Sequence, residues 1–260
     1  IRASDTSTVD MLMEGFTTHA PADEYAATII GVLGSAGTPA SQDALLEIIS
    51  TDAWPIELRS MAMQSLVQVT EPIASVDSIL ASVITTGGDL ADSAFMTLAA
   101  IGDRLRENDP DRSGEISRVI LETGNEMSKE SPERAALVLA AIANLGPAEV
   151  PDIVVESFRG QDDSLREQAI QSLQRIHTEL ADRMIGLAIS DSNEMVRTAA
   201  VQLLGDPDRK AGLEILRDQA LKDSSDRVRL TALMSLAAWN RADDDTLLQI
   251  LQAVVAEDTS

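Results

Sequence analysis

The sequence predicts an all-α fold in which about seven pairs of amphipathic helices stack on one another. Three observations lead to this prediction. Apolar residues make up 44% of the 260-residue chain but aromatic residues only 2%, so the core consists of small aliphatic side chains, which suit closely packed helix layers. Helix start and stop signals recur along the chain. One helical motif recurs at a nearly constant spacing.

The helix boundaries are marked by proline and glycine. Thr38-Pro39 and Ser131-Pro132 each place an N-cap residue before a proline at the first helical position. Trp54-Pro55 and Glu71-Pro72 are similar starts with weaker caps. Glycines stand where helices are expected to end: Gly34, Gly37, Gly87, Gly88, Gly146, Gly160 and Gly205. Between these marks the apolar residues follow helical spacing without strand-type alternation, and we expect about fourteen helices.

An internal repeat underlies the predicted stacking. Four segments share the pattern apolar-Arg-x-x-Ala-x-x-x-Leu, and they begin at Leu58-Arg59, Leu165-Arg166, Val196-Arg197 and Val228-Arg229. The last three arginines lie 31 and then 32 residues apart, a period that accommodates two helices and two turns. The apolar residue, the alanine and the leucine fall on one helix face. The alanine therefore allows a neighbouring helix to approach closely, and the leucine fills the layer beneath it.

The motif arginines are expected to have acidic partners, because their charge lies near a helix start and opposes the helix dipole. Asp191 precedes Arg197 by six residues, and Asp223 precedes Arg229 by six. Asp163 and Asp226 lie three residues before Arg166 and Arg229. We expect a ladder of Asp–Arg contacts that links the turns between helices. Each exposed pair would contribute about 0–1 kcal/mol, and its larger role would be to fix the angle between repeats.

This pattern, with an aspartate in the turn and an arginine early in the second helix, resembles the HEAT repeat superfamily, most closely over residues 160–240. Typical HEAT repeats run about 40 residues, so the shorter spacing here is similar to short, bacterial-style HEAT-like repeats. The resemblance implies a right-handed α-α superhelix, a single HEAT-like solenoid over residues 1–260. Its repeats would be irregular over residues 1–158 and regular over 159–260.

A looser resemblance links residues 8–205 to the helical superhelix of vitellogenin-type large lipid transfer proteins. It rests on segments such as ALVLAAIANLGPAEVPDI (136–153) and DSNEMVRTAAVQLL (191–204). The resemblance implies a curved double layer of helices around a lipid-carrying β-sheet region. No such region is visible in the sequence, so the lipid-binding domain would be a missing part of the same chain. Since the chain begins at Ile1 rather than Met, we expect a processed or excised product.

The charge restricts the class of partner. The chain has 43 acidic and 20 basic residues, a formal net charge of −23. Nucleic acids and anionic membrane surfaces require basic patches, so neither is expected as a partner.

The longest apolar run, Ala135 to Ala143, is shorter than the roughly 20 residues that a membrane span needs. The lack of cysteine excludes disulfides and thiolate chemistry without identifying the compartment. A basic protein or peptide partner and a divalent cation both remain compatible with the sequence.

The segment DPDRSGEI is a candidate calcium site. Asp109, Asp111 and Ser113 match the first, third and fifth positions of a calcium-binding loop. The twelfth position is Ile120, where a bidentate glutamate belongs. The alternative, which we favour, is an acidic connector in which Ser113 or Asp111 caps the next helix.

Other conspicuous residues are interpreted as structural. His177 is expected at a helix C-terminus and His19 in a turn, and neither has a spaced partner for a metal ion. Trp54 and Trp239 are expected to close the edges of helix layers, and Asp243–Asp245 to supply negative charge at a helix N-terminus. No Gly-x-Ser-x-Gly elbow is present, so the sequence predicts no catalytic residues and no cofactor.

The function that this sequence favours is a non-catalytic interaction or structural scaffold that binds a protein or peptide through an acidic helical surface. One alternative is the helical domain of a larger, vitellogenin-like lipid-transport protein. A more distant one is a lyase-like enzyme, because short HEAT-like repeats also occur in bilin lyases. Salt-sensitive binding of a basic peptide, a lipid-carrying sheet domain in the full reading frame, or a copurifying chromophore would distinguish the three.

Overall fold

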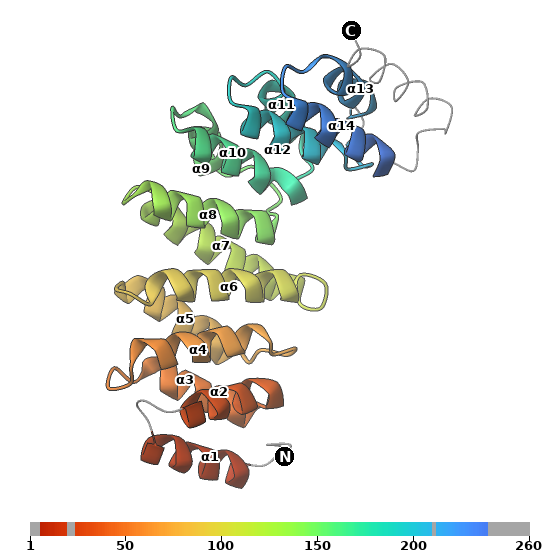
Figure 1. The fold of residues 1–260 in the computed structure, drawn as a ribbon. Helices are drawn as coiled ribbons and strands as arrows, with labels where there is room; N and C mark the ends of the chain where they lie inside the picture. Colours follow the sequence, from red (N-terminus) through yellow and green to blue (C-terminus); the bar gives the residue numbers. More distant parts are fainter. Residues whose placement is uncertain (1–5, 20–23, 210–211, 239–260) are drawn as a thin grey trace. The chain divides into compact units, whose positions relative to one another are not determined.

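The computed structural model describes residues 6–19, 24–209 and 212–238 (Figure 1). In these residues it contains fourteen α-helices, one short 3-10 helix and no strand, so the predicted all-α fold of stacked helices is confirmed. The chain divides into two compact units, Ile1–Lys129 and Glu130–Ser260.

The first unit consists of two layers of helices. Its helices are α1 (Thr6–His19), α2 (Glu24–Ala36), α3 (Pro39–Ser50), α4 (Ile56–Val67), α5 (Ala74–Thr86), α6 (Ala91–Leu105) and α7 (Pro110–Met127). Helices α1, α3, α5 and α7 pack in sequence in one layer, and α2, α4 and α6 in the other. Successive helices therefore alternate between layers, as helix pairs in a stack do.

The second unit repeats this arrangement. Its helices are α8 (Pro132–Leu145), α9 (Asp152–Arg159), α10 (Asp163–Gln171), the 3-10 helix η1 (Ser172–Arg175), α11 (Glu179–Ala188), α12 (Glu194–Leu204), α13 (Gly212–Lys222) and α14 (Asp226–Ala238). Helices α8, α10, α12 and α14 pack on one another in one layer, and α9, α11 and α13 each pack against a helix of that layer. The three regular copies of the motif thus lie on α10, α12 and α14, three helices in direct contact.

The motif alanines are buried inside these layers. Ala62, Ala169, Ala200 and Ala232 are all completely buried. The leucine four residues later in each copy is also buried. A small residue lets the neighbouring helix approach, and the leucine fills the space beside it, so the motif encodes layer packing directly.

Two of the expected helix starts are confirmed, and two are displaced. The Thr38 hydroxyl accepts a hydrogen bond from the Ser41 N–H, and the Ser131 hydroxyl accepts one from the Arg134 N–H. Helix α4 begins at Ile56, one residue after Pro55. Helix α5 begins at Ala74, two residues after Pro72. Ile73, the N-cap of α5, has an extended backbone, and its N–H donates to the buried side chain of Gln42 at 2.8 Å.

Gly34 does not end a helix, in contrast to the prediction. It lies inside α2, where a Cβ atom would come within 2.7 Å of the Ser65 Cβ atom on α4. The glycine is therefore required for the close approach of two helices in the same layer. Helix α2 ends two residues later and is followed by Gly37, whose φ of +61° is the left-handed conformation that glycine adopts readily.

Candidate functional site

The most regular polar feature of the second unit is a contact between the motif arginine of one repeat and an aspartate of the next. Arg166, the fourth residue of α10, donates from Nε and Nη2 to the two carboxylate oxygens of Asp191, each at 3.0 Å. Arg197, the fourth residue of α12, binds Asp223 in the same way at 2.9 and 3.0 Å. We call each of these two-pronged contacts a rung. Each rung joins consecutive repeats across 25 or 26 residues.

The expected contacts across three residues are present. Arg166 donates to the carboxylate of Asp163 at 2.6 Å, and Arg229 donates to that of Asp226 at 2.5 Å.

The pairs that lie six residues apart have a different contact from the one expected. Arg197 lies six residues after Asp191, but it donates to the main-chain carbonyl of Asp191 at 2.9 Å rather than to the carboxylate. Arg229 likewise donates to the carbonyl of Asp223 at 3.0 Å. The carboxylates point instead to the preceding repeat. Each aspartate therefore contacts two repeats. Its main-chain carbonyl accepts from the arginine of its own repeat, and its carboxylate accepts from the arginine of the preceding repeat.

The rungs are also more buried than the exposed pairs that we expected. The side chains of Arg166 and Arg197 are each 12% exposed, and those of Asp191 and Asp223 are 12% and 5% exposed. Each aspartate additionally accepts a hydrogen bond from the N–H two residues later, that of Asn193 or Ser225, at 2.8 Å. A rung therefore orders the turn before a helix as well as the contact between helices.

The protonation of the two rung carboxylates reflects these contacts. Burial alone would raise the pKa of Asp191 and of Asp223. The hydrogen bonds from the arginine of the preceding repeat and from the main-chain N–H outweigh burial, so the pKa of each carboxyl group lies below its ordinary value. Both groups are charged at neutral pH and are fixed by their partners.

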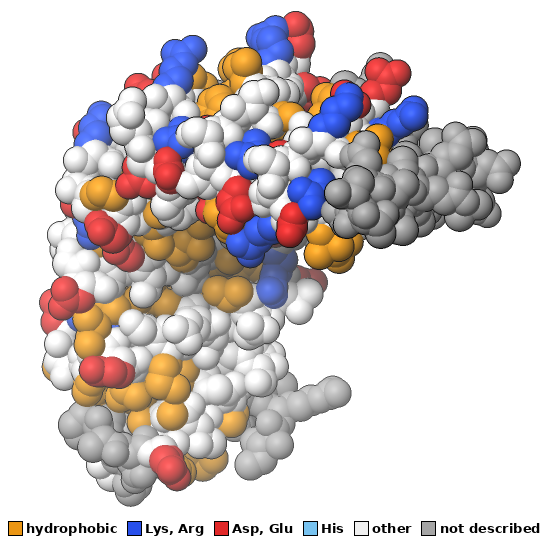
Figure 2. Space-filling view, turned by 45° about the horizontal axis from the view of Figure 1, so that its top comes forward, with side chains coloured by type: hydrophobic (Ala, Val, Ile, Leu, Met, Phe, Trp, Pro, Cys, Tyr) orange, Lys and Arg blue, Asp and Glu red, His pale blue; other side chains and the backbone are white. Residues whose placement is uncertain are grey.

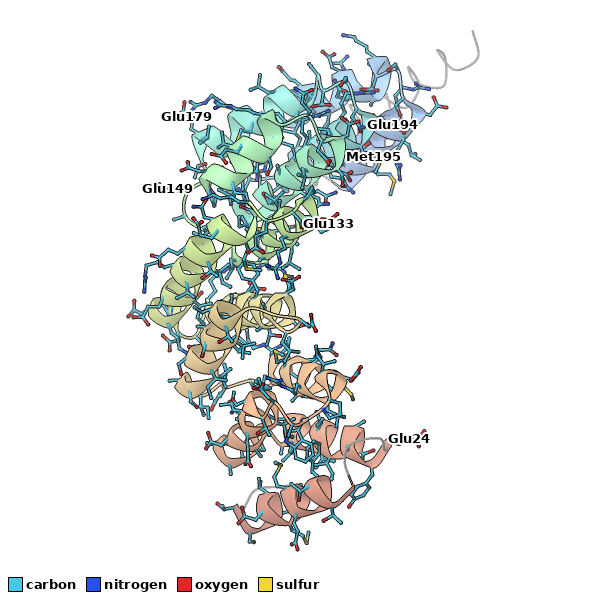
Figure 3. The ribbon with its side chains drawn as sticks, turned by 90° about the vertical axis from the view of Figure 1, so that its left-hand side faces the viewer. Glu24, Glu133, Glu149, Glu179, Glu194 and Met195 are labelled. Carbon is cyan, nitrogen blue, oxygen red and sulfur yellow. The ribbon has the colours of Figure 1, made fainter. Side chains whose placement is uncertain are left out.

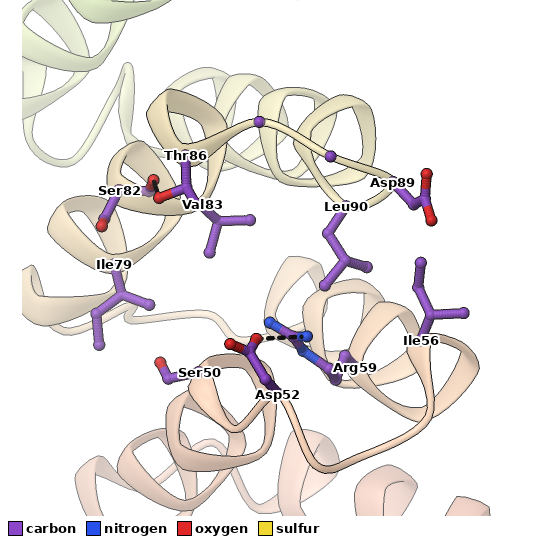
Figure 4. A pocket seen from close by; sticks show the side chains of 12 residues that line it. Ser50, Asp52, Ile56, Arg59, Ile79, Ser82, Val83, Thr86, Asp89 and Leu90 are labelled. Carbon is purple, nitrogen blue, oxygen red and sulfur yellow. Dashed lines mark hydrogen bonds and ion pairs between the residues drawn. The ribbon is translucent and has the colours of Figure 1, made fainter.

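The first copy of the motif, in the first unit, makes no rung. Arg59 is the fourth residue of α4, but it turns back to the turn between α3 and α4. Its Nε donates to the carbonyl of Ile49 at 2.8 Å, and its Nη1 forms an ion pair with Asp52 at 2.9 Å. A cavity of about 440 Å³ lies beside it, between α4, α5 and the turn before α6 (Figure 4).

A second cavity, of about 420 Å³, lies in the second unit beside Arg209. This arginine is buried, and it donates to the Asp182 carboxylate at 2.6 Å and to the Leu173 carbonyl at 2.7 Å. Arg209 was not predicted from the sequence. A signal was present, because Asp182 and Arg209 lie 27 residues apart, close to the spacing across a rung.

Arg112 in the first unit was also missed. Its guanidinium binds both oxygens of Asp77, at 2.6 and 2.8 Å, and also the carbonyls of Pro72 and Ile73. Asp77 lies on α5 and Arg112 on α7, so this contact joins neighbouring helices of one layer. Arg112 follows Asp111 rather than an apolar residue, so it does not share the repeated motif and the sequence pattern does not single it out.

The residues of the calcium hypothesis lie in a helix rather than a loop. Asp109 is the N-cap of α7, and its carboxylate accepts a hydrogen bond from the Arg112 N–H. The capping residue is thus Asp109, not Asp111 or Ser113 as we had expected. Asp111 is exposed in the first turn, and the buried Ser113 hydroxyl donates to the Gly102 carbonyl at 2.7 Å. Calcium binding by these residues stays a prediction.

The histidines and tryptophans that the sequence singled out lie in different parts of the chain. His19 is the last residue of α1 rather than part of a turn. His177 follows η1, and its Nε2 lies 3.6 Å from a carboxylate oxygen of Asp206. The Trp54 ring packs edge-on against Phe16 with ring centres 4.9 Å apart. Trp239 and Asp243–Asp245 lie outside the described residues.

Comparison with known proteins identifies the repeats of the second unit. Residues 181–260 match the family model for HEAT repeats. The sequence of this part of the chain is that of HEAT repeats. The predicted resemblance to the HEAT-like superfamily is thereby confirmed, and the HEAT repeats include the second rung. No curated protein matches the chain, and the looser resemblance to vitellogenin-type proteins stays a prediction.

Several solved structures resemble the chain distantly. The complex of CpcE and CpcF of phycocyanin lyase from Nostoc sp. PCC7120 is 12% identical, with 97% of this chain and 94% of that chain covered and a TM-score of 0.49. Human deoxyhypusine hydroxylase in complex with glycerol is 15% identical, with 93% of each chain covered and a TM-score of 0.40. At these TM-scores the likeness supports no argument about function. Among the described helices, none combines the length and the apolar character needed to cross a membrane.

Proposed function

We propose that this chain is a non-catalytic HEAT-repeat scaffold that binds a protein or peptide partner, and that the bound segment is basic. The observation that carries this proposal is the unequal use of the two kinds of charge. The arginines with the most contacts are bound to oxygens of the chain itself, whereas many carboxylates extend from the surface without a basic neighbour.

The arginines act mainly as internal clamps. Arg166 and Arg197 hold the rungs, Arg112 holds Asp77, and Arg209 joins Asp182 to the end of η1. Their side chains are between 2% and 18% exposed. Basic charge that is buried and paired in this way contributes little to the field at the surface. The surface therefore carries most of the excess of 43 acidic over 20 basic residues.

The acidic side chains are displayed outward. In the second unit, Glu133, Glu149 and Glu194 are exposed and extend away from the ribbon (Figure 3). Glu179 is also exposed, but it is paired with Arg183. On the face seen in Figure 2, basic side chains lie singly or beside acidic ones and form no broad patch. A Lys- or Arg-rich segment is attracted to such a surface and is oriented by it before it docks.

The chemistry of the rungs supports a binding role rather than a catalytic one. A general acid or base needs a pKa near the working pH and access to its substrate. The carboxylates of Asp191 and Asp223 have lowered pKa values and are held by arginines. They are therefore suited to ordering a stack of helices, whose extended surface is what repeat proteins use to bind partners.

The test is the salt dependence of binding to a basic probe. A fluorescent 15-residue peptide of alternating Lys and Gly is titrated with the full chain at low salt and at about five times that NaCl concentration. We expect the affinity to fall by about tenfold or more at the higher salt, because exposed charges are screened. The control peptide has Gln in place of every Lys. Equal affinity at both salt concentrations, or equal binding of the two peptides, contradicts the proposal.

Variants of the exposed acids sharpen this test. Glu133→Gln combined with Glu149→Gln removes two outward charges and is expected to weaken peptide binding about two- to tenfold at low salt. The matched control is Glu133→Asp combined with Glu149→Asp, which keeps both charges. If the two double variants bind the peptide equally, these acids do not contribute to the interaction surface.

A further inference from the structure

The first motif copy lacks the carboxylate that completes a rung. In the second unit, the rung aspartate stands three residues before the first residue of the next helix in the same layer, Asp191 before α12 and Asp223 before α14. Helix α4 carries Arg59, and the next helix in its layer is α6, which begins at Ala91. The corresponding position is Gly88, which has no side chain to offer.

Open space replaces the missing side chain. Gly87 and Gly88 have φ values of +77° and +84°, and a Cβ atom built on either would meet no atom within 4 Å. The cavity of about 440 Å³ lies here, bounded by this turn on one side and by Arg59 on the other. Its volume falls in the range of roughly 300–1,000 Å³ that small-ligand sites occupy.

Arg59 is only loosely engaged on the cavity side. Its partner Asp52 has a side chain that is 93% exposed, so their ion pair is open to solvent and weak. The Ile49 carbonyl occupies Nε, and Nη2 has no hydrogen-bond partner among the described residues. Figure 4 shows the Asp89 side chain directed away from the guanidinium. Between residues 3 and 103, Arg59 is the only Lys or Arg in the sequence.

The rest of the cavity wall combines aliphatic and polar side chains. Ile79 and Val83 lie one turn apart on α5, Ile56 is the first residue of α4, and Leu90 is the last residue before α6 (Figure 4). The polar side chains of the wall are those of Ser50, Asp52, Ser82, Thr86 and Asp89. Ile56, Ile79 and Val83 are partly exposed. The four aliphatic side chains beside the single cation suit a ligand that joins a hydrocarbon group to an anionic head.

We propose that this cavity binds a carboxylate with an adjoining aliphatic group, such as the C-terminus of a partner chain or an acidic side chain within it. The carboxylate takes the place on Arg59 that Asp191 and Asp223 occupy on the arginines of the HEAT repeats. Arginine binds a carboxylate through two parallel hydrogen bonds, and Asp52 turns into solvent when the ligand arrives. This site goes beyond the proposed function, because it uses the opposite charge and lies in the other unit.

The test is a titration of the ¹⁵N-labelled full chain followed by NMR at constant ionic strength. N-acetyl-leucine presents a terminal carboxylate, and N-acetyl-aspartic acid α-amide presents a side-chain carboxylate. The uncharged controls are N-acetyl-leucinamide and N-acetyl-asparagine α-amide. We expect at least one acid to shift the amide signals of Gly87 and Gly88 and the Nε–H signal of Arg59, with saturation, and its amide control to leave them in place. The acid that binds more tightly identifies the source of the carboxylate.

Two variants are expected to act in opposite directions. Asp52→Asn removes the internal competitor and should tighten binding of the acid about two- to tenfold, a gain that damaged folding does not produce. Arg59→Gln should abolish the saturable shift, and the exposed Arg118→Gln in the same unit should leave it unchanged. The proposal is overturned if neither acid shifts these signals, if acid and amide act alike, if Arg59→Gln retains binding, or if Asp52→Asn does not tighten it. Since no basic peptide is used, failure here is separate from failure of the proposed function.

Discussion

The two units join their helix layers with different chemistry. In the second unit, α10, α12 and α14 are connected by the same contact used twice, an arginine that grips the aspartate of the next repeat. In the first unit, the helices are joined by polar contacts that differ from one junction to the next. Gln42 bridges the Gly37 and Glu71 carbonyls and the Ile73 N–H, and Arg104 donates to the Val69 carbonyl at 2.8 Å.

This difference explains why the sequence repeat is clear in one unit and faint in the other. Both units build layers from amphipathic helices, so both have the same apolar pattern. Only a contact that is reused requires the same polar residues at the same spacing. The regular spacing of polar residues therefore indicates that one polar contact is reused between repeats. It does not indicate whether helix layers are present, because both units have them.

The largest expected effect is the loss of a rung. Arg197→Ala leaves the Asp223 carboxylate, which is 5% exposed, without its guanidinium. We expect the unfolding free energy to fall by about 2–4 kcal/mol, slightly less than for a fully buried pair. Urea denaturation followed by far-UV circular dichroism measures it. The control is Arg183→Ala, which removes an exposed pair with Glu179 and should cost less than about 0.5 kcal/mol. Equal losses would show that rungs have no special role.

A single-use junction of the first unit should also be costly. Gln42→Leu leaves one N–H and two carbonyls without their side-chain partner in a buried place. The expected loss is about 1–3 kcal/mol, measured in the same way. The exposed Gln68, whose side chain makes no such bridge, gives the control Gln68→Leu. If Gln42→Leu is as mild as this control, the bridge does not hold α3 to the segment before α5.

The rungs should also make stability depend on pH. The carboxyl groups of Asp191 and Asp223 have pKa values below the ordinary value of 3.8, because hydrogen bonds from arginine and the main chain outweigh burial. Their contribution is fully present above about pH 3.8 and is lost as the pH falls from there through the lower folded-state pKa values. Asp191→Asn combined with Asp223→Asn should flatten the fall in unfolding free energy across this window. An unchanged slope would contradict the assignment.

The smallest expected effect is at the broken copy of the motif. Arg59→Ala removes an ion pair with an exposed aspartate and one hydrogen bond to a carbonyl. We expect a loss of about 0.5–1 kcal/mol, clearly smaller than for Arg197→Ala at the matching helix position. A loss as large as that of Arg197 would show that Arg59 has a structural role that its contacts do not reveal.

The helix layers could be predicted because they depend on local signals. The N-caps at Thr38 and Ser131 and the buried motif alanines follow from spacing along one helix. The position of Gly34 could not be predicted in this way. A glycine at a helix end and a glycine at a helix contact look alike in a sequence, and only the distance to Ser65 on α4 separates them.

The sequence also did not predict which arginine binds each rung aspartate, for a related reason. Spacing within a repeat suggested Asp191 with Arg197, but the carboxylate binds Arg166, which lies in the previous repeat. That choice depends on how far one helix is displaced along its neighbour. The cavity beside Arg59 was missed for the same reason, because its walls come from three helices and a turn that meet only after stacking.

The rung has a consequence for how such a chain changes in length. Each rung joins the same two chemical groups, so an array that loses one whole repeat still presents an arginine to an aspartate. Deleting residues 191–222 joins Ser190 to Asp223 and leaves Arg166 facing Asp223 in place of Asp191. We expect this shortened chain to fold with cooperative unfolding in urea, whereas a deletion eight residues shorter should not. Duplication or loss of a repeat therefore needs no new interaction, and a gene for such an array is free to grow or shrink by whole modules.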